Sequence, residues 1–324
     1  MGSSNYHIVF YFLFYCLSTI KPALVISNCP HTITNVSLLS DLQELDLSWT
    51  NSLYNINITG SQIQTMLTLM NVALYNMTNF YWNYAENLND GKGITFGIML
   101  FTSGSFDGRR VIEKINDAAM QNGISHPLAA YFQAFLNIDN SEHDIYGNTS
   151  FIGGLDNFIQ DWQTYGSDLI AKQAQLDVIN DLYWEPTIDI ARSLKINHTA
   201  SVSQLFDICM NQGCDQDGYN NFGLIQLINM TDDALTIGLA EGANERDWNE
   251  KLAEIRNAYI DSDDIWNNSR AYTRAEIQRR IVETKDYNIT LPLDITCVDQ
   301  YQGGGKIRAF IFFFLLLTIL QLFI

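Results

Sequence analysis

Carboxylate and hydroxyl side chains gather in one glycine-rich stretch, NDGKGITFGIMLFTSGSFDG, which covers residues 89–108. Asp90 and Asp107 lie near its two ends, with Thr95 between them. Cleavage of a glycosidic bond needs a carboxylic acid to protonate the leaving oxygen and a second carboxylate to activate water or attack directly. Glycine turns let a backbone lie close under a flat sugar ring. The stretch is a candidate floor for a carbohydrate site, although a phosphate cradle, a metal loop or an ordinary hairpin fits the same residues.

Other catalytic and metal-binding motifs are absent from the sequence. It has no HExxH, paired CxxC, GxSxG or P-loop pattern. His126, His143 and His198 are far apart in the chain, so neither a histidine metal site nor a His-based triad has support. The acidic segment DNSEHD at residues 139–144 lacks the glycine and the final glutamate of a calcium loop, so we predict a solvated loop there. We therefore predict no metal site and no cofactor.

Hydrophobic periodicity predicts the helices that must position this stretch. Residues 61–75 carry an apolar stripe at helical spacing, and a longer helical pattern covers residues 155–184 and stops before Pro186. An alternating pattern typical of a strand occurs at residues 93–101. Shorter amphipathic helices are predicted at residues 201–210, 249–260 and 274–285. The predicted fold class is mainly α with a small β element.

The two ends of the chain are predicted to be targeting segments. The apolar run IVFYFLFYCLSTI at residues 8–20 is too short to span a bilayer and is typical of a secretory signal peptide, which we assign to residues 1–27. An apolar tail follows Gly303 and Gly304, an order typical of a GPI-anchor signal at residues 303–324, with an uncleaved tail anchor as the alternative. The sequence thus predicts a protein of the secreted pathway on the extracellular face of the plasma membrane.

Cysteines and glycosylation sequons agree with secretion. Four cysteines follow the predicted signal peptide, and an even number suits disulfide bonds in an oxidising compartment. Of the three possible pairings we favour Cys209 with Cys214 and Cys29 with Cys297; the alternative is that some remain free buried thiols. The predicted N-glycosylation sites are Asn35, Asn57, Asn76, Asn148, Asn197, Asn229, Asn267 and Asn288.

The charge balance limits the class of partner. With 36 Asp and Glu against 18 Lys and Arg, the net charge is −18. Such a charge repels nucleic acid and anionic membranes, so we predict no nucleic-acid partner. An acidic surface attracts a polycation instead, while solubility alone explains the same composition equally well.

Several segments, in order along the chain, resemble motifs of glycoside hydrolase family 46, the chitosanases. Residues 89–108 resemble the D-G-R-G-Y-T-x-G block of that family, and YWNYAEN just upstream resembles its Y-x-Y-[IV]-E motif. Further resemblances lie in AKQAQLDVINDLYWEPTIDIA, LFDICMNQGCDQDGYNNFGLI, AEIRNAYI and YTRAEIQRRIVETKDYNITLPL. The resemblance implies a mainly helical, two-lobed, lysozyme-like fold with a cleft between the lobes. It also implies cleavage of β-1,4-linked glucosamine chains with inversion.

The resemblance implies roles for individual residues. Asp90 matches the general base that activates water, and Thr95 matches the residue that holds this water. Lys92 and Gln212 depart from the family, which has arginine and histidine at these positions. The residues matched to substrate-binding positions are Tyr84, Glu86, Lys92, Gln212 and, for glucosamine ammonium groups, Asp107 and Asp263.

A buried ion-pair network is implied by the same resemblance. Asp207, Arg256 and Arg274 match its members, which in the family orient the catalytic acid. Arg270 is the alternative to Arg274, because this chain carries a small insertion there. The network thus predicts contacts among segments that are far apart in the sequence.

The family's general acid has no counterpart in this sequence. In the family it is a glutamate at the end of the helix that precedes the base, and the positions that correspond here are Leu74, Tyr75 and Asn76. No Asp or Glu occurs between Asp46 and Glu86. Glu86 is an alternative acid, but it precedes Asp90 closely in the chain, whereas inversion needs opposing carboxylates. The glycan predicted at Asn76 would stand at the mouth of the cleft.

These observations define the expected organisation and three functional hypotheses. We predict a signal peptide (1–27), an N-terminal extension (28–60), a two-lobed chitosanase-like domain (61–302) and an anchor signal (303–324). The first hypothesis is a surface glycoprotein that binds a cationic glucosamine polysaccharide, with hydrolysis impaired or lost. The second is an active inverting endo-chitosanase with Asp90 as base and a non-standard acid. The third is a surface recognition protein with a vestigial cleft.

Overall fold

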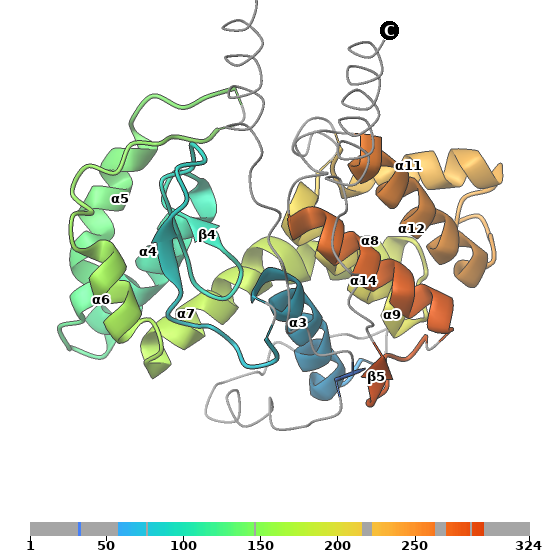
Figure 1. Ribbon diagram of the computed structural model, residues 1–324, viewed down its shortest axis with the longest axis horizontal. Coiled ribbons are helices and arrows are strands. Elements are labelled where there is room, and N and C mark those ends of the chain that lie inside the picture. Colours follow the sequence, from blue (N-terminus) through green and yellow to red (C-terminus); the bar gives the residue numbers. More distant parts are fainter. Residues whose placement is uncertain are drawn as a thin grey trace, which may run out of the picture. The chain divides into compact units, whose positions relative to one another are not determined.

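Helices make up most of the chain that the structure describes (Figure 1), as the predicted fold class requires. The computed structural model describes residues 32–33, 58–75, 77–145, 147–215, 222–262, 270–285 and 287–294. All of them belong to the unit Asn28–Cys297. Within these ranges, no helix has the length and apolar character needed to span a membrane. The two predicted targeting segments, with Gly303 and Gly304, lie outside the described residues, as does the predicted Cys29–Cys297 pair.

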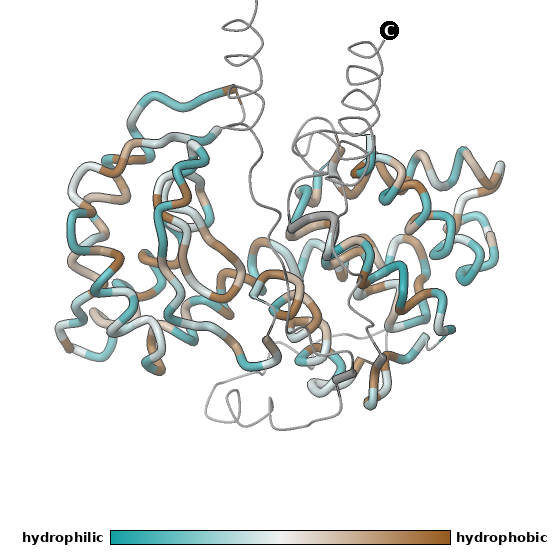
Figure 2. Tube along the Cα trace, in the orientation of Figure 1, coloured by the Kyte–Doolittle hydropathy of each residue, from teal (hydrophilic) through white to brown (hydrophobic). Residues whose placement is uncertain are grey.

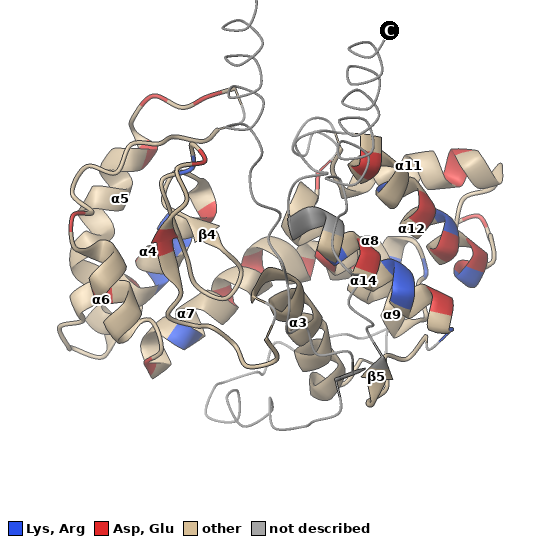
Figure 3. Ribbon diagram, viewed as in Figure 1, with Lys and Arg blue, Asp and Glu red and all other residues tan. Residues whose placement is uncertain are grey.

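Helix α3 (Gly60–Tyr75) is the apolar helix predicted from the stripe at residues 61–75. It begins with a capping box, in which Gln62 N donates to Thr59 Oγ1 at 3.2 Å and Thr59 N donates to Gln62 Oε1 at 2.8 Å. Nearly every side chain from Ile63 to Leu74 is buried, and Figure 3 shows the helix without a charged residue. The helix packs against α9 (Thr199–Gln212) and α14 (Arg270–Thr284). Its last turn is therefore fixed by the core.

A small antiparallel sheet follows α3 and contains most of the glycine-rich stretch. Its strands are β2 (Ala85–Asn87), β3 (Ile94–Phe96) and β4 (Phe101–Thr102), in the order β2-β3-β4. Phe96 anchors the sheet, because its ring contacts four other aromatic rings that include Phe158 and Trp162. Helix α4 (Phe106–Gln121) follows β4 directly. The helices around the sheet are η3 (Pro127–Tyr131), α5 (Phe132–Asp139) and α6 (Phe158–Tyr165).

One nearly continuous helical segment connects the elements around the sheet to the later helices. It consists of α7 (Leu169–Ile179), a π-helical turn η4 (Asn180–Trp184) and α8 (Glu185–Ser193). Helix α7 packs on α4, whereas α8 packs on α9. The prediction that this helix stops before Pro186 is wrong. Pro186 lies at the start of α8 just after the π-helical turn, where the missing N–H of a proline does the least harm.

The remaining helices pack on one another and on α3. Helix α12 (Glu245–Ser262) contacts both α11 (Leu224–Leu235) and α14, and α14 contacts α9 and α3. Figure 2 shows hydrophilic and hydrophobic residues alternating along α11 and α12, the pattern of amphipathic helices with one buried face. A short pair of strands, β1 (Thr32–Ile33) and β5 (Leu293–Asp294), brings an early and a late segment of the unit together.

Candidate functional site

Asp90 lies in the exposed turn between β2 and β3, which we call the β2–β3 hairpin. Its Oδ1 accepts a hydrogen bond from Lys92 N at 3.1 Å, which shapes the turn and leaves the carboxylate facing solvent. Gly93 makes the turn possible, because its φ is +75° and a Cβ there would lie 2.3 Å from Ser103 Oγ. The structure thus places the predicted base on a tight, exposed hairpin.

Thr95 lies in β3, opposite Glu86 of β2 and opposite Thr102 of β4. Side chains directly opposite each other in an antiparallel sheet share one face, so these residues line the same side. The Thr95 hydroxyl is buried and has no hydrogen-bond partner among the described residues. A buried hydroxyl in this state normally bonds an ordered water. The geometry therefore fits a residue that holds a water molecule.

Tyr84 and Glu86 form a polar pair beside the hairpin. The Tyr84 hydroxyl donates to Glu86 Oε2 at 3.0 Å, and the Glu86 side chain is exposed. The Tyr84 ring also contacts Tyr75 and Tyr81, with ring centroids 5.1 Å and 5.6 Å away. Because Glu86 and Asp90 belong to one hairpin, they are not carried by opposing elements.

Asp107 lies in the first turn of α4, where its carboxylate serves the fold. Oδ1 accepts hydrogen bonds from Gly108 N at 2.7 Å, from Thr102 N at 3.3 Å and from the Ser105 hydroxyl. The Tyr183 hydroxyl donates to Oδ2 at 3.5 Å. Burial raises the pKa of Asp107 above its ordinary value, although the hydrogen bonds from Ser105, Thr102 and Gly108 and the charge of Lys92 oppose the rise. One carboxylate oxygen is thus committed to the helix start, and the ammonium-binding role remains a prediction.

The end of α3 offers no carboxylate at the positions that correspond to the family's acid. Leu74 is buried in the hydrophobic core. The Tyr75 hydroxyl donates to the backbone carbonyl of Gly97, and its ring packs against Tyr81 and Tyr84. Asn76 lies outside the described residues. The last described turn of α3 is occupied by a core side chain and by a tyrosine tied to the β3–β4 turn.

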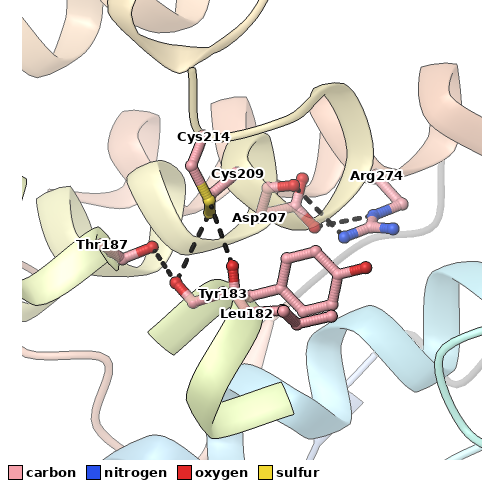
Figure 4. The surroundings of a disulfide bond; sticks show 7 residues. All are labelled: Leu182, Tyr183, Thr187, Asp207, Cys209, Cys214 and Arg274. Carbon is pink, nitrogen blue, oxygen red and sulfur yellow. Dashed lines mark hydrogen bonds and ion pairs between the residues drawn. A yellow bond between two sulfur atoms is a disulfide. The ribbon is translucent and has the colours of Figure 1, made fainter. Parts of the chain in front are cut away.

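Asp207, Arg256 and Arg274 come together in the interior as a buried charge cluster. Arg274 Nε lies 2.8 Å from Asp207 Oδ1 (Figure 4). Arg256 Nη2 lies 2.6 Å from Asp207 Oδ2. Arg256 Nε also donates to Gln212 Oε1 at 3.0 Å, so Gln212 contacts this cluster. Arg274 supplies the second arginine, and nothing is described of the Arg270 side chain.

The electrostatics of this cluster favour the charged aspartate. Burial alone would raise the pKa of Asp207, but the charges of Arg274 and Arg256 outweigh it and hold the pKa below its ordinary value. Burial also lowers the pKa of the Arg256 guanidinium, which the charge of Asp207 opposes. The carboxylate is therefore needed to balance two buried guanidinium groups.

Cys209 and Cys214 are joined by a disulfide bond at the end of α9. Figure 4 shows it beside the backbone of Leu182 and Tyr183 in the π-helical turn. Cys209 Sγ lies 3.4 Å from the carbonyl oxygen of Tyr183. Because Asp207 precedes Cys209 on the same helix, the bond fixes the end of the helix that carries the charge cluster.

The predicted glycosylation sites differ in exposure. Asn197, Asn229 and Asn288 are exposed. Asn148 is buried, and its Nδ2 faces Asp144 Oδ1 at 3.5 Å. The Asn148 side chain is thus less accessible than those of the three exposed sites, and glycosylation at all four stays a prediction. The sites outside the described residues are Asn35, Asn57, Asn76 and Asn267, together with the predicted ammonium ligand Asp263.

In the described ranges, no group of three or more His, Cys, Asp or Glu side chains could hold a metal ion.

Two contacts in the candidate site could not be predicted from the sequence. Tyr183 reaches Asp107 across 76 positions, and Tyr75 reaches Gly97 across 22. Both involve ordinary tyrosines on helical stripes, which periodicity assigns to the core.

Comparisons with known proteins now identify the family. Residues 69–293, more than half of the chain, match the profile of Glycosyl hydrolase family 46. The chain belongs to this family. A chitosanase of Bacillus subtilis (strain 168) is 23% identical over 266 residues, which cover 80% of this chain and 91% of that protein. A chitosanase of a Streptomyces species is 30% identical over 112 residues, which cover 35% of this chain and 36% of that protein.

Solved structures of chitosanases share the fold. The native chitosanase from Bacillus subtilis MY002 matches with a TM-score of 0.63 and 20% identity, covering 73% of this chain and 94% of that chain. The complex of the Gynuella sunshinyii chitosanase with chitotetraose matches with a TM-score of 0.64 and 23% identity, covering 75% of this chain and 97% of that chain. At these identities the likeness shows the fold alone. It confirms the predicted mainly helical, lysozyme-like class.

Proposed function

We propose that this chain is a chitosanase-like surface glycoprotein that binds a glucosamine-containing polysaccharide, with hydrolysis impaired or lost. Family membership supports the ligand class, because relatives with this fold have been solved with chitotetraose and with 6 GlcN. The exposed carboxylates of Asp90 and Glu86 and the net charge of −18 suit a polycationic chain. The β2–β3 hairpin is the part of the molecule where we place the ligand.

The proposal of impaired hydrolysis rests on the last described turn of α3. Inversion needs a base on one face of the sugar and an acid on the other. Asp90 and the water held by Thr95 would supply the base half. Leu74 and Tyr75 cannot supply the acid half, because one is a hydrocarbon and the other directs its hydroxyl to Gly97. Loss of general acid help lowers the rate of such a reaction by about 10²- to 10⁴-fold.

A binding and turnover assay tests the proposal. Purified chain is titrated with glucosamine hexamer by calorimetry, and the mixture is then followed for shorter products by mass spectrometry. We expect binding with little or no cleavage. Clear turnover that disappears in Asp90→Asn would show a working hydrolase, and loss of turnover in Glu86→Gln with hexamer binding unchanged would then identify Glu86 as its acid. Absence of binding would instead favour a vestigial cleft.

Restoring the acid tests its absence as the cause. Leu74→Glu, Tyr75→Glu and Asn76→Glu place a carboxylate at each corresponding position in turn. We expect at least one of them to gain turnover over the unmodified chain, with the double variant that also carries Asp90→Asn as the inactive control. If all three fold and none gains activity, the missing acid does not by itself explain the loss.

The surface location is supported by exposed sequons and by the disulfide. Asn197, Asn229 and Asn288 face solvent, and Cys209 pairs with Cys214 as suits an oxidising compartment. We expect the chain on intact cells to shift in mass after removal of N-glycans and to leave the cells after treatment with a phosphatidylinositol-specific phospholipase. Retention after the phospholipase would favour an uncleaved tail anchor.

A further inference from the structure

A second candidate binding region lies in the loop between α5 and α6, drawn in light green in Figure 1. This loop surrounds a surface pocket of about 650 Å³. Its lining residues include Ser141, Glu142, Ser150, Phe151, Ile152 and Asp156. We call this surface pocket the loop pocket. None of these residues belongs to the positions matched to the family's substrate site.

The loop pocket combines the three kinds of group that recognise an amino sugar. Glu142 and Asp156 have exposed carboxylates, neither of which has a hydrogen-bond or ion-pair partner among the described residues. Phe151 presents a ring that is 48% exposed, and serine hydroxyls complete the lining. The loop contains no Lys or Arg, and Figure 3 shows acidic residues along it. A glucosamine unit offers an ammonium group, hydroxyls and an apolar ring face to match them.

Gly153 explains how the aromatic ring is held. A Cβ at this position would lie 2.4 Å from the Phe151 ring, so the ring in its present position lies directly over Gly153. The ring therefore has a supported side and an exposed side. A ring in this state can stack on a sugar without first losing much side-chain freedom.

The loop pocket is attached to the β2–β3 hairpin by backbone hydrogen bonds. Thr149 N donates to the carbonyl oxygen of Gly104 at 2.9 Å, and Gly104 N donates to that of Lys92 at 2.9 Å. Ile152, which lines the pocket, comes within 3.4 Å of a Cβ built on Gly93. The pocket wall thus lies against the hairpin two or three residues from Asp90. An extended polymer bound at Asp90 has a direct route to it.

We propose that the loop pocket is an additional subsite for one glucosamine unit of the same polysaccharide chain. Glu142 and Asp156 hold the ammonium group, and Phe151 stacks on the sugar face. This inference rests on the proposed function, because it extends the ligand beyond the hairpin. It predicts that long oligomers bind more tightly than those too short to reach the loop.

Calorimetry with glucosamine hexamer and glucosamine dimer tests the subsite on the full chain. The variants are Glu142→Gln with Asp156→Asn, and separately Phe151→Ala. The matched control is Asp117→Asn with Asp233→Asn, which removes the same charge from exposed positions on other helices. We expect the charge variant and the aromatic variant each to weaken hexamer binding about 3- to 10-fold and to leave dimer binding unchanged. The preference for the hexamer over its N-acetylated form should shrink in the charge variant alone.

Each outcome decides the inference. Hexamer binding that survives both loop-pocket variants, or falls equally in the control pair, overturns the subsite while the proposed function stands. Failure of the unmodified chain to bind any glucosamine oligomer overturns the proposed function, and the subsite falls with it. Thermal unfolding of each variant shows that a loss of binding is not a loss of folding.

Discussion

The β2–β3 hairpin and the buried charge cluster handle carboxylates in opposite ways. In the hairpin, Asp90 is exposed and its described contact is with the backbone of its own turn. In the cluster, Asp207 is 1% exposed and balances two guanidinium groups. The cluster is therefore a requirement of the fold, and its presence says little about chemistry. The hairpin carboxylates are exposed, so we expect their replacement by the matching amides to change ligand binding more than stability.

The largest effect that separates the two regions is expected for Asp207→Asn. The substitution leaves two buried arginines without a balancing charge, which costs about 3–5 kcal/mol of unfolding free energy. Asp90→Asn serves as the matched control and should change stability by less than about 0.5 kcal/mol. Urea denaturation followed by circular dichroism measures both. Equal losses of unfolding free energy in the two variants would contradict the view that the fold needs the buried cluster more than the hairpin carboxylate.

A smaller effect is expected where the hairpin meets the loop pocket. A Cβ at Gly104 would lie 1.9 Å from the carbonyl oxygen of Thr149 and 2.8 Å from that of Lys92. Gly104→Ala must therefore push backbone apart, at a cost of about 1–3 kcal/mol. Gly91→Ala, where nothing lies within 4 Å, isolates the strain of a positive φ. Urea denaturation should show the larger loss for Gly104→Ala.

The end of α3 allows a finer test. Tyr75→Phe removes the hydroxyl that donates to Gly97 and should cost about 0.5–1.5 kcal/mol. Tyr81→Phe is the control, since the Tyr81 hydroxyl has no hydrogen-bond partner among the described residues. Thermal unfolding compares the two. If Tyr75→Phe is as stable as Tyr81→Phe, the hydroxyl does not fix this turn.

The smallest effect is a difference in how stability depends on pH. Asp107 has a raised pKa in the folded chain, so between 3.8 and that raised value the folded state holds a proton that the unfolded state lacks. Its contribution to stability is therefore full below 3.8 and is lost as the pH rises through the raised pKa. Asp207 has a lowered pKa, so its contribution is present above 3.8 and is lost as the pH falls through the folded pKa.

Chemical denaturation across this acid range checks the two signs. The stability difference between the unmodified chain and Asp107→Asn should decrease as the pH rises. The difference between the unmodified chain and Asp207→Asn should increase as the pH rises. A common sign for the two would show that burial and charge pairing do not set these pKa values as described.

The sequence predicted the long helices well because their apolar stripes are strong. The helix predicted at residues 61–75 begins at Gly60 in the structure, where the capping box lies. The run at residues 155–184 contains two helices, because α6 ends at Tyr165 and α7 begins at Leu169 with Asp168 as its cap. Helix α4 was not predicted, since its start lies within the glycine-rich stretch that we interpreted as turn.

The candidate site was predicted only in part. Residue types placed Asp90 and Thr95 on a turn and a strand, and the resemblance brought Asp207 to Arg256 and Arg274 across the chain. Spacing could not show that Asp107 is committed to the start of α4, because that depends on Ser105 and on Tyr183 from another helix. Such contacts are products of packing, and no local pattern encodes them.

The π-helical turn at residues 180–184 has a consequence for the register of the whole unit. Each residue advances an α-helix by about 100°, so one additional residue in a turn rotates everything that follows it. This turn thus sets the rotation between two helix faces, the face of α7 that meets α4 and the face of α8 that meets α9. Deletion of one residue within it would make the helix regular and turn Thr187 and Ile188 of α8, both buried in the structure, away from their present neighbours.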